Sequence, residues 1–192
     1  MALGFYLDMT RCSGCHVCQI ACKDRFDLQN AGPLPRRVFT YETGVYPNAR
    51  MYHISIGCNH CQTPACMVNC PTGALFKADD GTVQCDESLC TGCMACVTAC
   101  PYGAPQWADE LNALIKCDSC KALRDAGRNP VCVDACLMRA LDFGDVDELR
   151  AKYGDDLVSE VACLPGADTT NPNLLIKAPE SALNDEFVEV IL

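Results

Sequence analysis

The sequence of 192 residues predicts a small, loop-rich α+β fold in which one cysteine-rich unit is inserted into a second unit of the same kind. Three observations support this prediction. The cysteines come in regular groups, short motifs repeat around these groups, and strand-like segments lie at both ends of the cysteine array and in its middle. The length allows one or two small domains, and the many cysteines, glycines and prolines leave little room for long helices.

Sixteen of the 18 cysteines form four groups of four. The groups are Cys12-Cys15-Cys18-Cys22, Cys58-Cys61-Cys66-Cys70, Cys90-Cys93-Cys96-Cys100 and Cys117-Cys120-Cys132-Cys136. The first and third have the spacing C-x2-C-x2-C-x3-C, and Pro101 after the third completes the pattern of bacterial two-cluster ferredoxins. In that pattern three cysteines hold one cubane cluster and the fourth ligates the other cluster. The sequence therefore predicts four [4Fe–4S] clusters, whose binding should supply part of the folding free energy.

Zinc and disulfides are the alternative uses of these cysteines. Zinc binds C-x2-C pairs, but a tetrahedral site takes two pairs and has no use for the additional cysteines of the first and third groups. Disulfide frameworks are typical of secreted chains shorter than this one, and cysteines so close in sequence pair poorly. Cys85 and Cys163 lie outside the groups and are expected to be small buried apolar residues.

The sequence repeats itself around the cysteine groups. Cys70-Pro71-Thr72-Gly73-Ala74 is similar to Cys100-Pro101-Tyr102-Gly103-Ala104, and Cys12-Ser13-Gly14-Cys15 is similar to Cys90-Thr91-Gly92-Cys93. Glycine at such positions lets the backbone approach a cluster closely and direct N–H groups at sulfur. The repeat indicates two units of one architecture.

Strand signals indicate how the two units are connected. Ala74–Ala78 and Thr82–Asp86 flank Asp79-Asp80-Gly81, a pattern that predicts a β-hairpin. A second pair is expected between Gly4–Asp8 and Ala140–Phe143, which lie at opposite ends of the cysteine array. This pairing would bring the first group beside the fourth and the second beside the third, so the topology would be nested.

The predicted boundaries follow from this topology. Residues 1–28 and 101–155 form the outer ferredoxin-like unit, 50–100 the inserted unit, 29–49 a connecting loop and 156–192 a C-terminal docking tail. Within this frame, 23–57 is expected to be irregular except for a strand-like end at Tyr52–Ile56, and helical turns are expected after the third cysteine of each group. Asp145 is expected to cap a helix over Val146–Tyr153 that ends at Gly154.

The charge and hydropathy of the sequence exclude several functions. A formal net charge of −10 argues against nucleic-acid binding, which requires a basic face. No segment approaches the ~18–20 apolar residues of a membrane-spanning helix. The N-terminus lacks the basic region and apolar core of a signal peptide. Any contact with a membrane is therefore expected to come through a partner.

The sequence shows no catalytic constellation, and we predict a non-catalytic protein. Four complete sets of cysteines leave no iron open to a substrate. The three histidines, His16, His53 and His60, are too few for a catalytic site. His16 and His60 are expected to support a cluster or face solvent; iron ligation by His60 is the alternative. Trp107 is expected to pack against a cluster or the core.

The four groups in this order, the segment Cys100–Gln106 and the stretch from Ala140 to Arg150 resemble a known family. They are similar to the iron–sulfur (B) subunits of bacterial dimethyl sulfoxide reductases, which belong to the wider set of four-cluster subunits of molybdopterin oxidoreductases. The resemblance covers nearly the whole sequence. Leu137 stands where proline is common in close relatives, so the turn after Cys136 is less constrained.

The resemblance implies a specific set of ligands. Carried over by position, they are Cys12, Cys15, Cys18 and Cys136 for cluster 1; Cys22, Cys117, Cys120 and Cys132 for cluster 2; Cys58, Cys61, Cys66 and Cys100 for cluster 3; and Cys70, Cys90, Cys93 and Cys96 for cluster 4. Cluster 1 would lie nearest the catalytic subunit and cluster 4 nearest the membrane. Because Cys96 is present, all four are expected to be cubanes.

The resemblance also implies partners. An electron-transfer subunit of this kind works in anaerobic respiration between a molybdopterin-containing catalytic subunit and an integral membrane anchor that oxidises quinol. It would be membrane-associated through these partners, without direct insertion, at the extracytoplasmic face after co-export or, alternatively, at the cytoplasmic face. The competing hypotheses are a free-standing soluble carrier of the polyferredoxin type and a zinc or assembly module.

Overall fold

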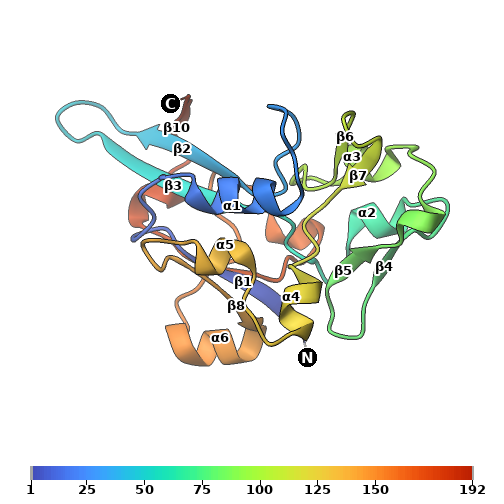
Figure 1. The fold of residues 1–192 in the computed structure, drawn as a ribbon. Helices are drawn as coiled ribbons and strands as arrows, with labels where there is room; N and C mark the ends of the chain where they lie inside the picture. Colours follow the sequence, from blue (N-terminus) through green and yellow to red (C-terminus); the bar gives the residue numbers. More distant parts are fainter. Residues whose placement is uncertain (1, 192) are drawn as a thin grey trace.

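The computed structural model describes residues 2–191, which form a small mixed α/β protein with short elements and long connections (Figure 1). The helices are α1 Val17–Arg25, α2 Ala65–Val68, α3 Ala95–Ala99, α4 Lys121–Asp125, α5 Val131–Asp134 and α6 Val146–Tyr153, with 3-10 turns η1 Glu87–Leu89, η2 Ala167–Thr169 and η3 Glu180–Leu183. The strands are β1 Leu3–Asp8, β2 Arg37–Thr43, β3 Arg50–Ile56, β4 Leu75–Lys77, β5 Val83–Cys85, β6 Gln106–Ala108, β7 Ala113–Ile115, β8 Leu141–Asp145, β9 Leu174–Lys177 and β10 Phe187–Val190.

A three-stranded sheet in the order β8-β1-β9 forms the centre of the molecule. β1 pairs antiparallel with β8, Phe5 facing Phe143, and parallel with β9, Phe5 facing Leu174. The predicted pairing of Gly4–Asp8 with Ala140–Phe143 is therefore confirmed. Side chains alternate between the faces of a strand, so Phe5 belongs to the main core while Tyr6 packs in a smaller cluster on the other side.

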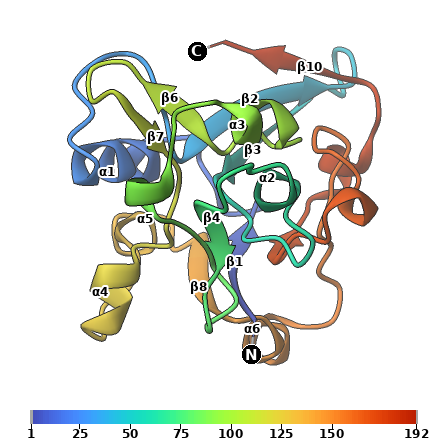
Figure 2. The ribbon, with the colours of Figure 1, turned by 90° about the vertical axis from the view of Figure 1, so that its right-hand side faces the viewer.

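Helix α6 covers that second face and lies at the bottom of the molecule (Figure 2). The Asp145 carboxylate accepts hydrogen bonds from the backbone N–H groups of Asp147 and Glu148, at 3.0 and 3.3 Å, and thereby caps the helix. Tyr153 stacks on Tyr6 with ring centroids 3.7 Å apart. The predicted cap and the end at Gly154 are both confirmed.

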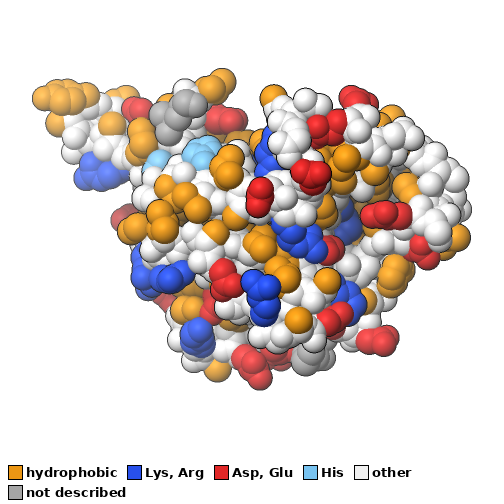
Figure 3. All heavy atoms as spheres, viewed as in Figure 1, with side chains coloured by type: hydrophobic (Ala, Val, Ile, Leu, Met, Phe, Trp, Pro, Cys, Tyr) orange, Lys and Arg blue, Asp and Glu red, His pale blue; other side chains and the backbone are white. Residues whose placement is uncertain are grey.

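A second three-stranded sheet, in the order β10-β2-β3, projects from the body as a hairpin. The turn between β2 and β3 contains Val45 and Tyr46, which are 79% and 93% accessible. Hydrophobic side chains are visible at the end of this projection (Figure 3). The strand-like end predicted at Tyr52–Ile56 is confirmed within β3. The prediction of a connecting loop over 29–49 is wrong for β2, because the alternation of β-branched and aromatic residues from Val38 to Thr43 pairs it fully with β3.

Two short hairpins complete the fold. The β4–β5 hairpin around Asp79-Asp80-Gly81 is confirmed, whereas the β6–β7 hairpin was not predicted. In each of the four groups a helical turn begins immediately before the third cysteine and contains it: α1 with Cys18, α2 with Cys66, α3 with Cys96 and α5 with Cys132. The prediction that these turns follow the third cysteine is therefore wrong by a few residues.

The segment predicted as a C-terminal docking tail contributes to the body of the protein. β9 is an edge strand of the central sheet and pairs with β1. Val158 forms an isolated bridge with Ile176 of β9. Ala182 is fully buried. Docking by the rest of the segment stays a prediction. Among residues 2–191, no helix is long and apolar enough to cross a membrane.

Candidate metal-cluster sites

Three small cavities are each lined by four cysteines. We call them site 1, site 3 and site 4. Site 1 is lined by Cys12, Cys15, Cys18 and Cys136; site 3 by Cys58, Cys61, Cys66 and Cys100; and site 4 by Cys70, Cys90, Cys93 and Cys96. Each cavity therefore combines three cysteines of one group with the fourth cysteine of another.

The remaining four cysteines, Cys22, Cys117, Cys120 and Cys132, are all buried, and we call them site 2. Helices α1 and α5, which carry Cys22 and Cys132, pack against each other. Burial raises the pKa of Cys22 above its usual range, and the neighbouring thiols of Cys117, Cys132 and Cys120 raise it further. The structure thus brings these four thiols into mutual electrostatic contact.

The backbone repeats around the sites as the sequence does. His16 and Met94 occupy the same place in the first and third groups, and both have left-handed backbone with φ of 60° and 56°. Gly14 and Gly92 also have positive φ, and a Cβ on either would collide with an aromatic ring: His53 at 2.5 Å for Gly14, Trp107 at 3.0 Å for Gly92. Both glycines are thus required by conformation and by close packing.

Deprotonation of the buried thiols is unfavourable unless a cation lies among them. Burial, together with the neighbouring thiols, raises the pKa of Cys61 to about 11 and that of Cys66 and Cys132 to about 12. Among residues 2–191, no three His, Cys, Asp or Glu side chains converge closely enough for a single ion. The thiols instead stand around cavities, an arrangement that suits a cationic group with several metal atoms.

Several donors point at the cysteine sulfurs. The Thr170 hydroxyl donates to Cys61 Sγ at 3.2 Å, and Ser55 Oγ lies 3.3 Å from Cys18 Sγ. The backbone N–H of Ala140 donates to Cys136 Sγ at 3.2 Å, and that of Ser119 to Cys117 Sγ at 3.4 Å. Donors to a ligating sulfur stabilise its negative charge and are one means by which proteins adjust clusters.

The histidines and the tryptophan hold supporting positions. His60 is fully buried, and its Nδ1 accepts the backbone N–H of Val83 at 3.0 Å, which leaves Nε2 4.0 Å from Cys117 Sγ. The Nδ1 of His53 bonds to Thr40 Oγ1 at 2.9 Å. Trp107 lines site 4, in agreement with its predicted packing. His16 is half-buried at the edge of site 1.

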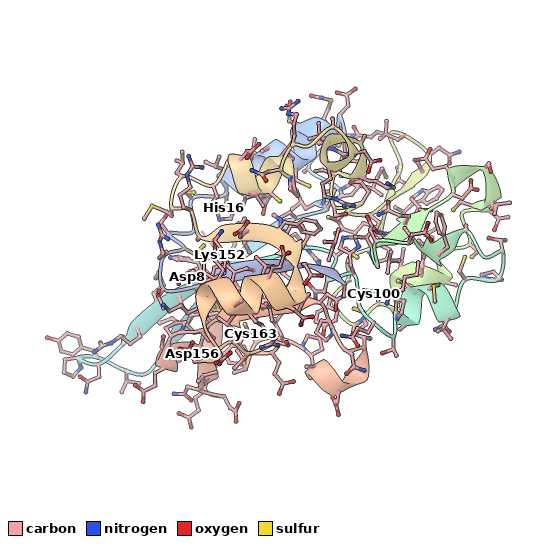
Figure 4. All side chains as sticks on the ribbon, turned by 90° about the horizontal axis from the view of Figure 1, so that it is seen from below. Asp8, His16, Cys100, Lys152, Asp156 and Cys163 are labelled. Atoms are coloured by element: carbon pink, nitrogen blue, oxygen red, sulfur yellow. The ribbon has the colours of Figure 1, made fainter. Side chains whose placement is uncertain are left out.

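The two cysteines outside the groups are only half-buried, so the prediction of full burial is wrong. Cys85 lies in β5, and Cys163 lies beside Tyr52. Figure 4 shows Cys163 well apart from the site 3 residue Cys100, which lies toward the green hairpins. No cysteine of the four sites depends on either.

Sequence reasoning missed Thr170, Arg36 and Lys116, which lie close to the thiols. The Thr170 hydroxyl comes from the C-terminal segment, 109 residues away from Cys61. Arg36 and Lys116 are charged residues with almost no exposure. No local spacing marks Thr170 or Arg36, and the only sequence signal for Lys116 is its position immediately before Cys117.

Sites 1 and 4 each have an exposed cysteine, site 3 has one half-buried cysteine, and all four cysteines of site 2 are buried. Cys15 in site 1 and Cys93 in site 4 are exposed, and the other cysteines among the described residues are half-buried or buried. Apolar side chains near both sites are exposed as well. Leu137 and Met138 lie beside Cys136 of site 1, and Met94 lies beside Cys93 of site 4.

The class of the protein follows from this geometry and from two family models. A model described as "4Fe-4S dicluster domain" matches residues 49–146, and one described as "4Fe-4S binding domain" matches 9–27. The molecule is an iron–sulfur protein of the [4Fe–4S] type.

Curated relatives define the family more closely. The sequence is 46% identical over 182 residues to the B chain of the anaerobic dimethyl sulfoxide reductase of Escherichia coli (strain K12), covering 91% of this protein and 87% of that one. It is 36% identical to the B subunit of the sulfite dehydrogenase of Allochromatium vinosum, with 85% and 80% covered. It is 34% identical to the thiosulfate reductase electron transfer subunit of Salmonella typhi, with 73% and 74% covered. The protein belongs to the family of the B chains of anaerobic dimethyl sulfoxide reductases.

Proposed function

We propose that this protein is a non-catalytic electron-transfer subunit that relays electrons through four [4Fe–4S] clusters. The electrons would pass between a quinol-oxidising membrane anchor and a molybdopterin-containing catalytic subunit. The arrangement of the sixteen thiols as four sets of four carries this proposal, because three sets line small cavities and the fourth is buried.

The ligands that we propose are the cysteines of sites 1 to 4. Four thiols around a cavity fit a cubane, because each of its four irons takes one cysteine. The raised thiol pKa values also fit a cationic cluster, because the cysteines must release their protons when they bind it. A bound [4Fe–4S] cluster accepts and donates one electron at a time. The protein supplies the thiols, the donors to sulfur and, at site 2, the burial of all four thiols.

Sites 1 and 2 both draw on the first and fourth cysteine groups, and sites 3 and 4 both draw on the second and third. This sharing supports a nested organisation of two ferredoxin-like units. In this organisation sites 1 and 2 belong to the outer unit and sites 3 and 4 to the inserted one. Neighbouring sites also come into contact: Cys18 of site 1 acts on Cys132 of site 2, and Cys58 of site 3 acts on Cys117 of site 2. Electrons would therefore pass in the order of the site numbers, in either direction.

The partners are inferred from the relatives and the surface. The relatives are chains or subunits of reductases and dehydrogenases, and one of them is called an electron transfer subunit. The exposed thiols at sites 1 and 4, with apolar side chains around them, provide two places for electron exchange. Site 1 would face the catalytic subunit and site 4 the membrane anchor. Through these partners the protein would be membrane-associated, at the extracytoplasmic or the cytoplasmic face.

Metal content tests the clusters. Protein produced and purified anaerobically should contain about sixteen iron atoms per molecule and little zinc, because each of four cubanes holds four irons. The measurement is elemental analysis together with electron paramagnetic resonance of the reduced protein. Stoichiometric zinc with negligible iron after anaerobic reconstitution would contradict the proposal. Purification of the native complex distinguishes the remaining alternative, because a free-standing carrier would be obtained without a molybdenum subunit.

A further inference from the structure

Two buried cations have no carboxylate partner. Arg36 is 2% exposed and Lys116 is 5% exposed. The ion pairs found among residues 2–191 are Arg25–Asp118, Lys121–Asp125, Arg124–Asp80 and Lys152–Asp142, none of which includes Arg36 or Lys116. Burial of a charge is costly unless an opposite charge compensates it, so both cations require another source of negative charge.

Arg36 lies between site 1 and site 2. Its Nη1 donates to the backbone oxygen of Ser55 at 3.2 Å and to Ser55 Oγ at 3.1 Å, and that hydroxyl is 3.3 Å from Cys18 Sγ of site 1. The guanidinium carbon lies 4.5 Å from the centre of the Phe5 ring, which fixes its position. Burial lowers the pKa of Arg36, but nearby thiols, with Cys132 and Cys117 of site 2 foremost, raise it above its ordinary value.

Lys116 lies between site 2 and site 3. Its Nζ donates to the backbone oxygens of Cys117 at 2.7 Å and Val83 at 2.5 Å, so two carbonyls fix the ammonium group beside a site 2 ligand. The same nitrogen is 4.0 Å from Cys58 Sγ of site 3. The ammonium group of Lys116 therefore lies against residues of both sites.

We propose that Arg36 and Lys116 are fixed counter-charges, each shared by two neighbouring cluster sites, that raise the reduction potentials of the clusters held there. The inference rests on the proposed function, because it requires clusters at sites 1 to 3. Reduction adds one negative charge to a cluster, and a cation in the low-dielectric interior stabilises that charge strongly. Neither residue is proposed as a ligand; both would act on the clusters electrostatically, across space and through the ligating thiols.

The placement predicts a specific pattern of changes. Arg36→Gln should lower the reduction potentials of the clusters at sites 1 and 2, and Lys116→Met those at sites 2 and 3. The site 2 cluster should respond to both substitutions. Site 4 should respond least, because the hydrogen-bond contacts of Arg36 and Lys116 are with Ser55, Val83, Cys117 and Cys58, none of which belongs to site 4.

The experiment is a redox titration of the anaerobically purified holoprotein, followed by electron paramagnetic resonance. Arg50→Gln and Lys177→Met, at exposed positions, are the matched controls and should leave all four potentials unchanged. The charge-preserving variants Arg36→Lys and Lys116→Arg should remain closer to the wild-type potentials than the neutral ones. Assignment of site 4 comes from the three-iron signal of Cys96→Ser.

Two different failures are distinguishable. Wild-type protein without clusters would overturn the proposed function itself. Wild-type protein with four clusters, beside neutral variants with full iron and unchanged potentials, would overturn only the role of the two cations. If a neutral variant loses iron, the charge-preserving variant decides: retention of iron there supports the counter-charge, and equal loss in both overturns it.

Discussion

A single hydroxyl connects the C-terminal segment to a cluster site. Thr170 is 1% exposed and donates to Cys61 Sγ at 3.2 Å. The backbone on either side is held by the second cysteine group, since the N–H groups of Gln62 and Thr63 donate to the carbonyls of Asn171 and Thr170. The backbone that carries the hydroxyl is therefore fixed relative to site 3.

We expect Thr170→Val to lower the reduction potential of the site 3 cluster. A hydrogen bond to a ligating sulfur stabilises the more negative, reduced state, and valine keeps the shape of threonine without the donor. The change is measured by redox titration with electron paramagnetic resonance. Thr170→Ser keeps the hydroxyl and is the control. A fall of the same size in both variants would show that packing, and not the hydrogen bond, determines the potential.

At the scale of residues, the sequence predicted the thiols that lie together but not their surroundings. The C-x2-C-x2-C-x3-C spacing is a local property and indicated that three cysteines of a group share a site while the fourth serves another. The full sets of four came from the family resemblance, and binding of clusters by them stays a prediction. Thr170, Arg36 and Lys116 approach the thiols only through the tertiary fold. Their burial could be predicted only from the packing of β1, β3 and the C-terminal segment.

At the scale of elements, an ion pair joins the β4–β5 hairpin to helix α4. Arg124 Nη2 lies 2.9 Å from Asp80 Oδ2, and the other carboxylate oxygen accepts from the backbone and side chain of Thr82 at 2.9 and 2.6 Å. The guanidinium also lies over the Phe143 ring of β8. Burial raises the pKa of Asp80, but these hydrogen bonds outweigh it and lower the value to about 2.

We expect Asp80→Asn to destabilise the holoprotein by about 1–2 kcal/mol, because it removes the charge opposite Arg124 while the Thr82 bonds persist. A depressed carboxyl pKa gives stability that is present above the unfolded value near 4 and lost as pH falls toward about 2. The difference from wild type should thus be constant between pH 5 and 8. Anaerobic denaturant unfolding followed by circular dichroism measures it.

The exposed neighbour Asp79 provides the control, since Asp79→Asn changes the same formal charge in the same turn. Its stability should stay within a few tenths of a kcal/mol of wild type. A loss equal to that of Asp80→Asn would attribute the effect to the turn and not to the ion pair.

Elements whose position depends on neighbouring residues were predicted better than strands whose position depends on pairing with a distant part of the sequence. The Asp-Gly turn of β4–β5 and the Asp145 cap of α6 are local patterns, and both are confirmed. β9 pairs in parallel with β1 across the length of the sequence, and a run of three apolar residues, Leu174 to Ile176, does not show which strand it will join. β2 was missed because it lies in a long segment without cysteines.

At the scale of the whole molecule, site 2 has only buried thiols, whereas sites 1 and 4 each have an exposed one, Cys15 and Cys93. Thiol–thiol interactions connect site 2 with site 1, through Cys132 and Cys18, and with site 3, through Cys117 and Cys58. Such an order suits transfer between two partners, since water and small reactants are kept from the buried site 2. It also means that loss of a ligand at site 4 should leave electron transfer through site 1 intact, and the reverse.

Cys96→Ser tests this separation at site 4. Cys96 is buried at the start of α3, and the other thiols of the site, Cys70, Cys90 and Cys93, could still hold three irons. We expect a folded subunit that remains in its complex, with a three-iron signal by electron paramagnetic resonance. Loss of one iron changes the charge and the reduction potential of the cluster.

Electron flow from quinol should slow in this variant, because under our proposal every electron from the anchor enters at site 4. Reduction of the catalytic subunit with a small artificial donor that enters elsewhere should survive. Cys163→Ser, outside the four groups, is the control and should leave both rates unchanged. Equal loss with both donors in Cys96→Ser would place site 4 elsewhere along the electron path, or show that the substitution disrupts the fold.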